Sequence, residues 1–167
     1  MVNFDIFLND LYRSIGIAMP ELILTITFAV AIIADLMFKK VRSIAGWVGL
    51  VGFGATAYSM MTLSGTSAFG FSQLLVVDPF AEFFKYLFLL SGAGVILMSL
   101  FSDELWKESR SMGEYYTLIL GMTIGMFLIA GAGNLIMIYL ALETMSLSSY
   151  VLAGYTKEIK RASEASL

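Results

Sequence analysis

The sequence contains neither histidine nor cysteine, and each absence excludes a class of chemistry. Without cysteine there is no disulfide, thiolate zinc site or iron–sulfur cluster, and without histidine there is no His-ligated haem. Serine–histidine and cysteine nucleophiles are excluded for the same reason. The formal net charge of −3 also leaves no basic footprint for a nucleic acid. We therefore expect no metal, cofactor or nucleic-acid site in this chain.

Charge of either sign is scarce. Only 14% of the 167 residues are charged and 59% are hydrophobic, and the mean hydropathy is +0.85. A soluble domain has about 25% charged and about 45–50% apolar residues. The composition therefore excludes a water-soluble globule and predicts a membrane protein.

Uncharged stretches of membrane length separate the bunched charges. A helix needs about 20 mainly apolar residues to cross the hydrocarbon core. The 28 uncharged residues between Glu114 and Glu143 are too many for one span, and Gly131-Ala132-Gly133-Asn134 within them is a turn signal. We expect an all-α polytopic membrane protein, a single membrane domain over residues 1–167, with five spans at about 19–38, 44–63, 80–101, 115–130 and 135–155.

The basic residues predict how these spans are oriented. Eight of the ten Lys and Arg residues follow the first, third and fifth spans, and these are Lys39, Lys40, Arg42, Lys107, Arg110, Lys157, Lys160 and Arg161. By the positive-inside rule, that side is cytoplasmic, which puts the N-terminus outside and the C-terminus inside. Trp47 and Trp106 lie near the same boundary, as interfacial anchors do. The first ten residues have no Lys or Arg, so they do not read as a signal peptide.

Glu143 lies near the middle of the last predicted span, where a carboxylate costs about 2.5–3.5 kcal/mol. Helical spacing puts Tyr139, Glu143, Ser146 and Tyr150 on one stripe, with Ser149 close by. Intramembrane ionisable groups tend to mark ion paths and proton relays. We therefore interpret Glu143 as a proton-holding carboxylate in a supporting polar face. The alternative is a neutral, structural Glu143 hydrogen-bonded to a serine.

A second charged group stands at the outer end of the third predicted span. Asp78, Glu82 and Lys85 are spaced so that Glu82 and Lys85 can pair along one helix. Lys85 then either extends outward in an interfacial pair or turns inward as part of a proton pathway, and the sequence leaves both open. Glu21 and Asp35 lie near span ends, so we expect both to be interfacial.

The C-terminal third of the chain, from Gly113 onward, resembles a known family. The segments that carry the likeness are 113–116, 121–122 and above all 139–155, with the pattern Leu-Glu-Thr-Met-Ser-Leu-Ser-Ser-Tyr around Glu143. Residues 19–24, 78–85 and 160–167 agree more loosely. Together they resemble the antiporter-like subunit N of respiratory complex I, the proton-translocating NADH:quinone oxidoreductase.

The resemblance implies a non-redox, proton-translocating role. In that family the glutamate matching Glu143 pairs with a lysine on a later, broken helix, and flavin and iron–sulfur clusters lie in partner subunits. The expected partners are the other membrane-arm subunits and the lipid bilayer. The expected location is the inner (cytoplasmic) membrane, or an energy-transducing organelle membrane. Family members have about fourteen spans, so we expect this chain to be the N-terminal part of a longer subunit.

Two other functions stay open at this point. A multisubunit sodium/proton antiporter shares the antiporter-like module and a glutamate at this place. A membrane scaffold without a transport role would also have five spans. The Ser-Leu-Ser-Ser-Tyr run at residues 146–150 favours subunit N.

Overall fold

The computed structural model describes residues 4–38, 43–63, 65, 67–71, 73–102 and 112–155. In chain order, the elements are α1 (Phe4–Ile17), α2 (Met19–Met37), α3 (Ile44–Leu63), β1 (Ala68–Gly70), β2 (Leu75–Val77), α4 (Pro79–Leu100), α6 (Met112–Ala130) and α7 (Leu135–Ala153). The fold is a helical bundle with one short hairpin, so the all-α prediction is confirmed.

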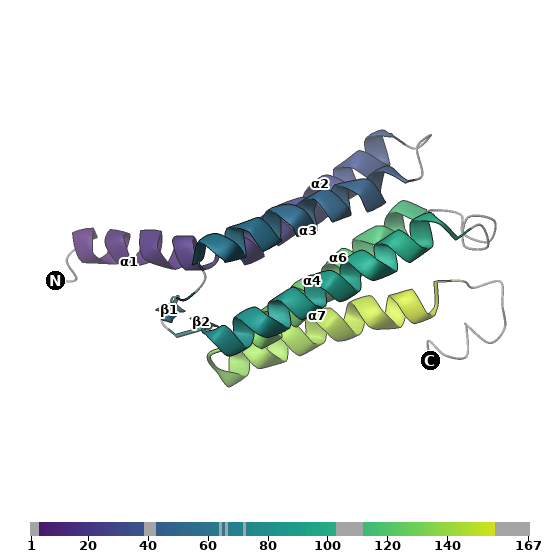
Figure 1. Cartoon of the computed structure of the whole chain (residues 1–167). Helices are drawn as coiled ribbons and strands as arrows, with labels where there is room; N and C mark the ends of the chain where they lie inside the picture. Colours follow the sequence, from purple (N-terminus) through teal and green to yellow (C-terminus); the bar gives the residue numbers. More distant parts are fainter. Residues whose placement is uncertain are drawn as a thin grey trace.

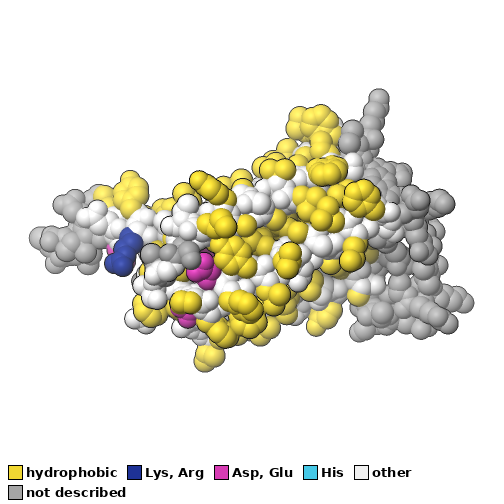
Figure 2. Space-filling model, viewed as in Figure 1, with side chains coloured by type: hydrophobic (Ala, Val, Ile, Leu, Met, Phe, Trp, Pro, Cys, Tyr) yellow, Lys and Arg dark blue, Asp and Glu magenta, His cyan; other side chains and the backbone are white. Residues whose placement is uncertain are grey.

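Within the described residues, five helices are long and apolar enough to cross a membrane: α2, α3, α4, α6 and α7. This confirms the predicted number of spans. Pro20 and Pro79 stand in the first turns of α2 and α4, where a missing N–H breaks no helical hydrogen bond. Hydrophobic side chains cover the visible face of the bundle along these helices (Figure 2). The chain is a polytopic membrane protein.

The long helices run roughly along one axis, with α6 at the centre (Figure 1). Helix α6 packs against α2, α3, α4 and α7, whereas α7 packs mainly against α6. The main core lies around α6 and contains Leu24, Phe53, Ile96, Leu120 and Phe127. As a result α7 lies at the margin of the bundle, with one side against α6 and the other uncovered.

Two features of the N-terminal half were not predicted. Residues 4–17 form α1, which the sequence analysis left unassigned, and the connection at 64–79 contains an antiparallel hairpin. Ser14 Oγ in α1 accepts a hydrogen bond from the Phe71 backbone N–H, so α1 and the hairpin are joined. We call this end of the bundle, with α1 and β1–β2, the hairpin end (Figure 1).

The predicted turn at residues 131–134 is confirmed and meets the hairpin. The Val76 N–H donates to the Gly131 carbonyl over 2.8 Å, and the Gly133 N–H donates to the Leu74 carbonyl over 2.9 Å. Asn134 then begins α7, because its side chain accepts from the Met137 N–H. The α6–α7 turn is thereby fixed against the connection between α3 and α4.

The groups of basic residues used to predict orientation lie outside the described residues. So do Trp106 and the segment 160–167 that contributed to the resemblance. Trp47 is described, and 54% of its surface is exposed near the start of α3. The predicted orientation of the termini stays a prediction.

Candidate functional site

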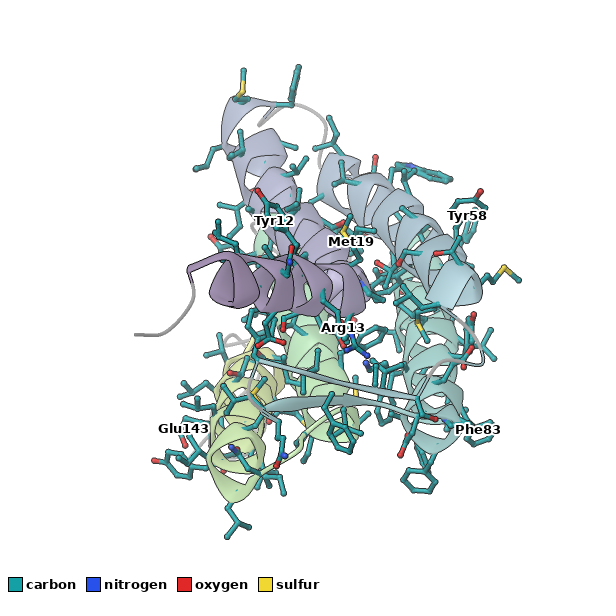
Figure 3. All side chains as sticks on the ribbon, turned by 90° about the vertical axis from the view of Figure 1, so that its left-hand side faces the viewer. Tyr12, Arg13, Met19, Tyr58, Phe83 and Glu143 are labelled. Atoms are coloured by element: carbon teal, nitrogen blue, oxygen red, sulfur yellow. The ribbon has the colours of Figure 1, made fainter. Side chains whose placement is uncertain are left out.

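Glu143 lies on the side of α7 that faces away from the bundle (Figure 3). The opposite side of α7 packs on α6 through the fully buried Ala141 and through Leu152. Residues two apart on a helix differ by about 200° in direction, so burying Ala141 turns Glu143 outward. Its position therefore follows from the rotation of α7 about its own axis.

Two glycines of α6 set that rotation. A Cβ added to Gly125 would lie 2.8 Å from the Met145 backbone nitrogen and 3.0 Å from the Ala141 carbonyl oxygen. A Cβ added to Gly121 would lie 3.0 Å from Ser148 Oγ. The G-x-x-x-G step thus brings the two helix backbones together, as such steps do in membrane proteins. The sequence analysis identified the step as allowing close helix approach but did not link it to Glu143.

The predicted polar face is largely assembled on the outward side of α7. Tyr139 and Tyr150 are 65% and 64% exposed, and Glu143 is exposed between them. Ser146 is half-buried on the same side, while Ser149 is half-buried at its edge and donates a hydrogen bond to the Ser146 carbonyl over 2.8 Å. A carboxylate on this face would meet lipid unless more protein or water covers it. Contact of a carboxylate with lipid costs several kcal/mol.

Lys85 is placed differently from Glu143. It points into the bundle and forms an ion pair and hydrogen bond with Glu21 of α2, and the two side chains are only 5% and 8% exposed. Lys85 therefore turns inward rather than outward, and its part in a proton pathway stays a prediction. Glu21 stands in the first turn of α2, at a span end as predicted, but its side chain is buried against Lys85 of α4.

The surroundings of Lys85 favour a cation. Its Nζ lies 5.8 Å from the centre of the Phe127 ring and beside Gly131, just beyond the C-terminus of α6, where the helix dipole is negative. Glu21 in turn lies at the positive N-terminus of α2. Glu82, predicted as a possible partner of Lys85, is half-buried, and the two residues line one small pocket. Asp78 instead begins α4, with its side chain accepting from the Ala81 N–H over 2.6 Å.

Asp35 lies at the other end of α2 and is half-exposed, as an interfacial residue is. Its carboxylate rests on Gly113 in the first turn of α6, where an added Cβ would fall 1.8 Å from Asp35 Oδ1. Negative charge is favourable at a helix N-terminus. Asp35 therefore joins two spans at the end opposite the hairpin.

Comparison with known proteins shows which proteins this chain resembles. Residues 132–167 match the family described as NADH:quinone oxidoreductase/Mrp antiporter, TM. The chain is 41% identical over 151 residues to NADH-quinone oxidoreductase subunit N 2 of Chloroherpeton thalassium, covering 89% of this chain and 30% of that protein. It is 37% identical over 162 residues to NADH-quinone oxidoreductase subunit N of Chlorobium chlorochromatii, covering 94% and 31%. These matches support a fragment of subunit N: most of this chain is similar to part of that protein.

A further relative has a different name. NAD(P)H-quinone oxidoreductase subunit 2 of Thermosynechococcus vestitus is 40% identical over 156 residues, which is 91% of this chain and 30% of that protein. The chain therefore spans about a third of the length of the curated relatives it matches.

Proposed function

We propose that this chain acts, within a longer membrane-arm subunit of NADH:quinone oxidoreductase, in proton translocation driven by electron transfer in other subunits. The observation that supports this most is the outward carboxylate of Glu143, placed within a membrane-length helix on a face with two tyrosines. Such a group is costly in lipid, so we expect protein or an aqueous path to cover it. A role in proton transfer accounts for the presence of a carboxylate at this position.

The proposed chemistry is a change of protonation at Glu143. A cation close to a buried carboxylate favours its charged form, and withdrawal of that cation favours proton uptake. A positive group on the protein that covers α7 would therefore couple charge movement to proton transfer. Tyr139, Ser146, Ser149 and Tyr150 would supply hydrogen bonds along the route. Lys85 is the second residue of the proposed pathway, at the hairpin end.

The remaining parts of the proposal concern location and partners. The C-terminal ends of α2, α4 and α7 lie together at the end opposite the hairpin (Figure 1). Eight of the ten basic residues follow these three helices in the sequence. By the positive-inside rule, this supports a cytoplasmic location for that end and an outer location for the hairpin. We place the chain in the inner membrane, or in an energy-transducing organelle membrane, beside other antiporter-like subunits. Flavin and iron–sulfur clusters belong to partner subunits in this proposal.

The substitution Glu143→Gln in the assembled complex tests the proposal. Glutamine keeps the size of the side chain but cannot release a proton, so proton translocation should fall while the complex still assembles. Glu114→Gln is the matched control, because Glu114 is an exposed acidic residue in the first turn of the neighbouring helix α6, at the end opposite the hairpin. Unchanged translocation in the Glu143 variant would contradict the proposal.

The alternative is a multisubunit sodium/proton antiporter, and the matched family description names both kinds of protein. Purification from native membranes separates the two. Flavin and iron–sulfur proteins in the purified assembly support complex I, and their absence supports the antiporter. A scaffold without transport predicts instead that Glu143→Ala changes assembly and leaves translocation by the assembled complex intact.

A further inference from the structure

The hairpin end contains a cluster of charges that the proposed role of Glu143 does not use. Lys85 and Glu21 form a buried ion pair between α4 and α2. The second oxygen of Glu21, Oε2, is buried and has no hydrogen-bond partner. A buried carboxylate oxygen without a donor costs free energy, because it has lost its hydration and gained no protein contact in return.

A second carboxylate lies beside this pair. Glu82 is three residues before Lys85 on α4, a spacing that puts the two on neighbouring parts of the helix surface. Both line a pocket with Ile17, Pro20, Met60, Leu63 and Val77. The pocket has room for about one water molecule, and its half-buried Glu82 gives it a polar side.

The charges of this cluster do not balance. When all three groups are ionised, Glu21 and Glu82 contribute two negative charges and Lys85 contributes one positive charge. Phe127 of α6 and Met60 and Leu63 of α3 add apolar neighbours, so water screens the excess charge poorly. One additional proton on either carboxylate would neutralise the cluster. If that proton were on Glu21, the unpartnered oxygen would belong to a neutral carboxyl group instead of a charged carboxylate.

The geometry points to a proton-binding site at the hairpin end, formed by Glu21, Lys85 and Glu82 and reached through the pocket beside Lys85. The site takes up one proton, on Glu21 or on Glu82. It rests on the proposed function in one respect: the bound proton is one of those that cross the membrane. The other ionisable groups described at this end are Asp10, Tyr12, Arg13, Tyr58, Asp78, Tyr86 and Tyr139.

Infrared spectroscopy of the assembled complex tests this site directly. A protonated carboxyl group shows a C=O stretch that a carboxylate lacks, so the band is followed as the pH is changed. When the spectrum of Glu82→Gln is subtracted from that of wild type, the band of one carboxyl group that changes with pH should remain. Subtracting the spectrum of Glu21→Gln from that of wild type should leave the same band.

Two outcomes would overturn the inference. One is a titrating band that is identical in wild type, Glu21→Gln and Glu82→Gln, which means that the ion pair stays charged and no proton is taken up. The other is a Glu143→Gln variant that abolishes the band, which would assign it to α7. Because the band is read without any measurement of translocation, a failure of the role proposed for Glu143 leaves this test intact.

Discussion

Gly125 of α6 lies so close to Met145 of α7 that an added Cβ would stand 2.8 Å from the Met145 backbone nitrogen. Two backbones in such contact cannot rotate past one another without separating. The contact therefore holds α7 with Ala141 toward α6 and Glu143 away from it. A packing contact within the bundle thus decides which way the intramembrane carboxylate faces.

Gly125→Ala should destabilise the subunit by about 1–3 kcal/mol, because the new methyl group meets backbone atoms that cannot move aside. Gly54→Ala on α3 is the matched control, since nothing lies within 4 Å of its added Cβ. Alanine there should be neutral or stabilising by up to about 1 kcal/mol through helix propensity. Thermal unfolding of the whole subunit in detergent measures both, and equal melting temperatures would contradict the described α6–α7 contact.

Gly113→Ala should be destabilising because of the side chain of Asp35. The three atoms nearest to an added Cβ at Gly113 all belong to the Asp35 carboxylate. The double variant Asp35→Ala with Gly113→Ala removes this conflict, so it should be more stable than Gly113→Ala alone. A double-mutant cycle on thermal stability measures the coupling between the two sites. Additive effects would show that the two residues are not in contact.

The buried pair of Glu21 and Lys85 should show the same kind of non-additivity with larger values. Glu21→Gln or Lys85→Met alone leaves one buried charge without its partner and should cost about 3–5 kcal/mol. The double variant leaves no buried charge in the pair and should recover most of that loss. The yield and thermal stability of the assembled subunit provide the measurement. A double variant as unstable as the worse single variant would contradict a mutual interaction.

The orientation of the chain can be tested with single cysteines, because the sequence has none of its own. Phe69 at the hairpin end is 65% exposed, and Phe38 at the opposite end of the bundle is 51% exposed. A membrane-impermeant maleimide should label Phe69→Cys from outside the cell and Phe38→Cys only in inverted vesicles. The reverse pattern would show that the positive-inside assignment is wrong.

The spans could be predicted because lipid imposes a length and a composition on each helix separately. Residues 44–63 were predicted as a span and form α3, and the turn signal at Gly131 does separate α6 from α7. The order of the helices and the number of spans follow from such local signals. The short helix α1 escaped because its 14 residues are fewer than a span needs and contain charged residues.

Contacts between helices could not be predicted in the same way. Glu21 lies one residue after Pro20 at a span end, which is what an interfacial residue looks like in sequence. Its burial depends on Lys85, which lies 64 positions away, and no local pattern encodes that pairing. The helical spacing around Glu143 did predict a shared face, but its direction depends on where α6 lies. A residue's neighbours on its own helix are readable from sequence, and its neighbours on other helices are not.

The most direct test of the central claim is the rate of proton translocation by the assembled complex carrying Glu143→Gln or Glu143→Asp. If Glu143 transfers protons, Glu143→Gln should reduce the rate of translocation by about tenfold or more. Glu143→Asp, which retains a carboxylate, should keep a substantial part of it. Normal assembly with unchanged proton translocation in the Glu143→Gln complex would contradict the account.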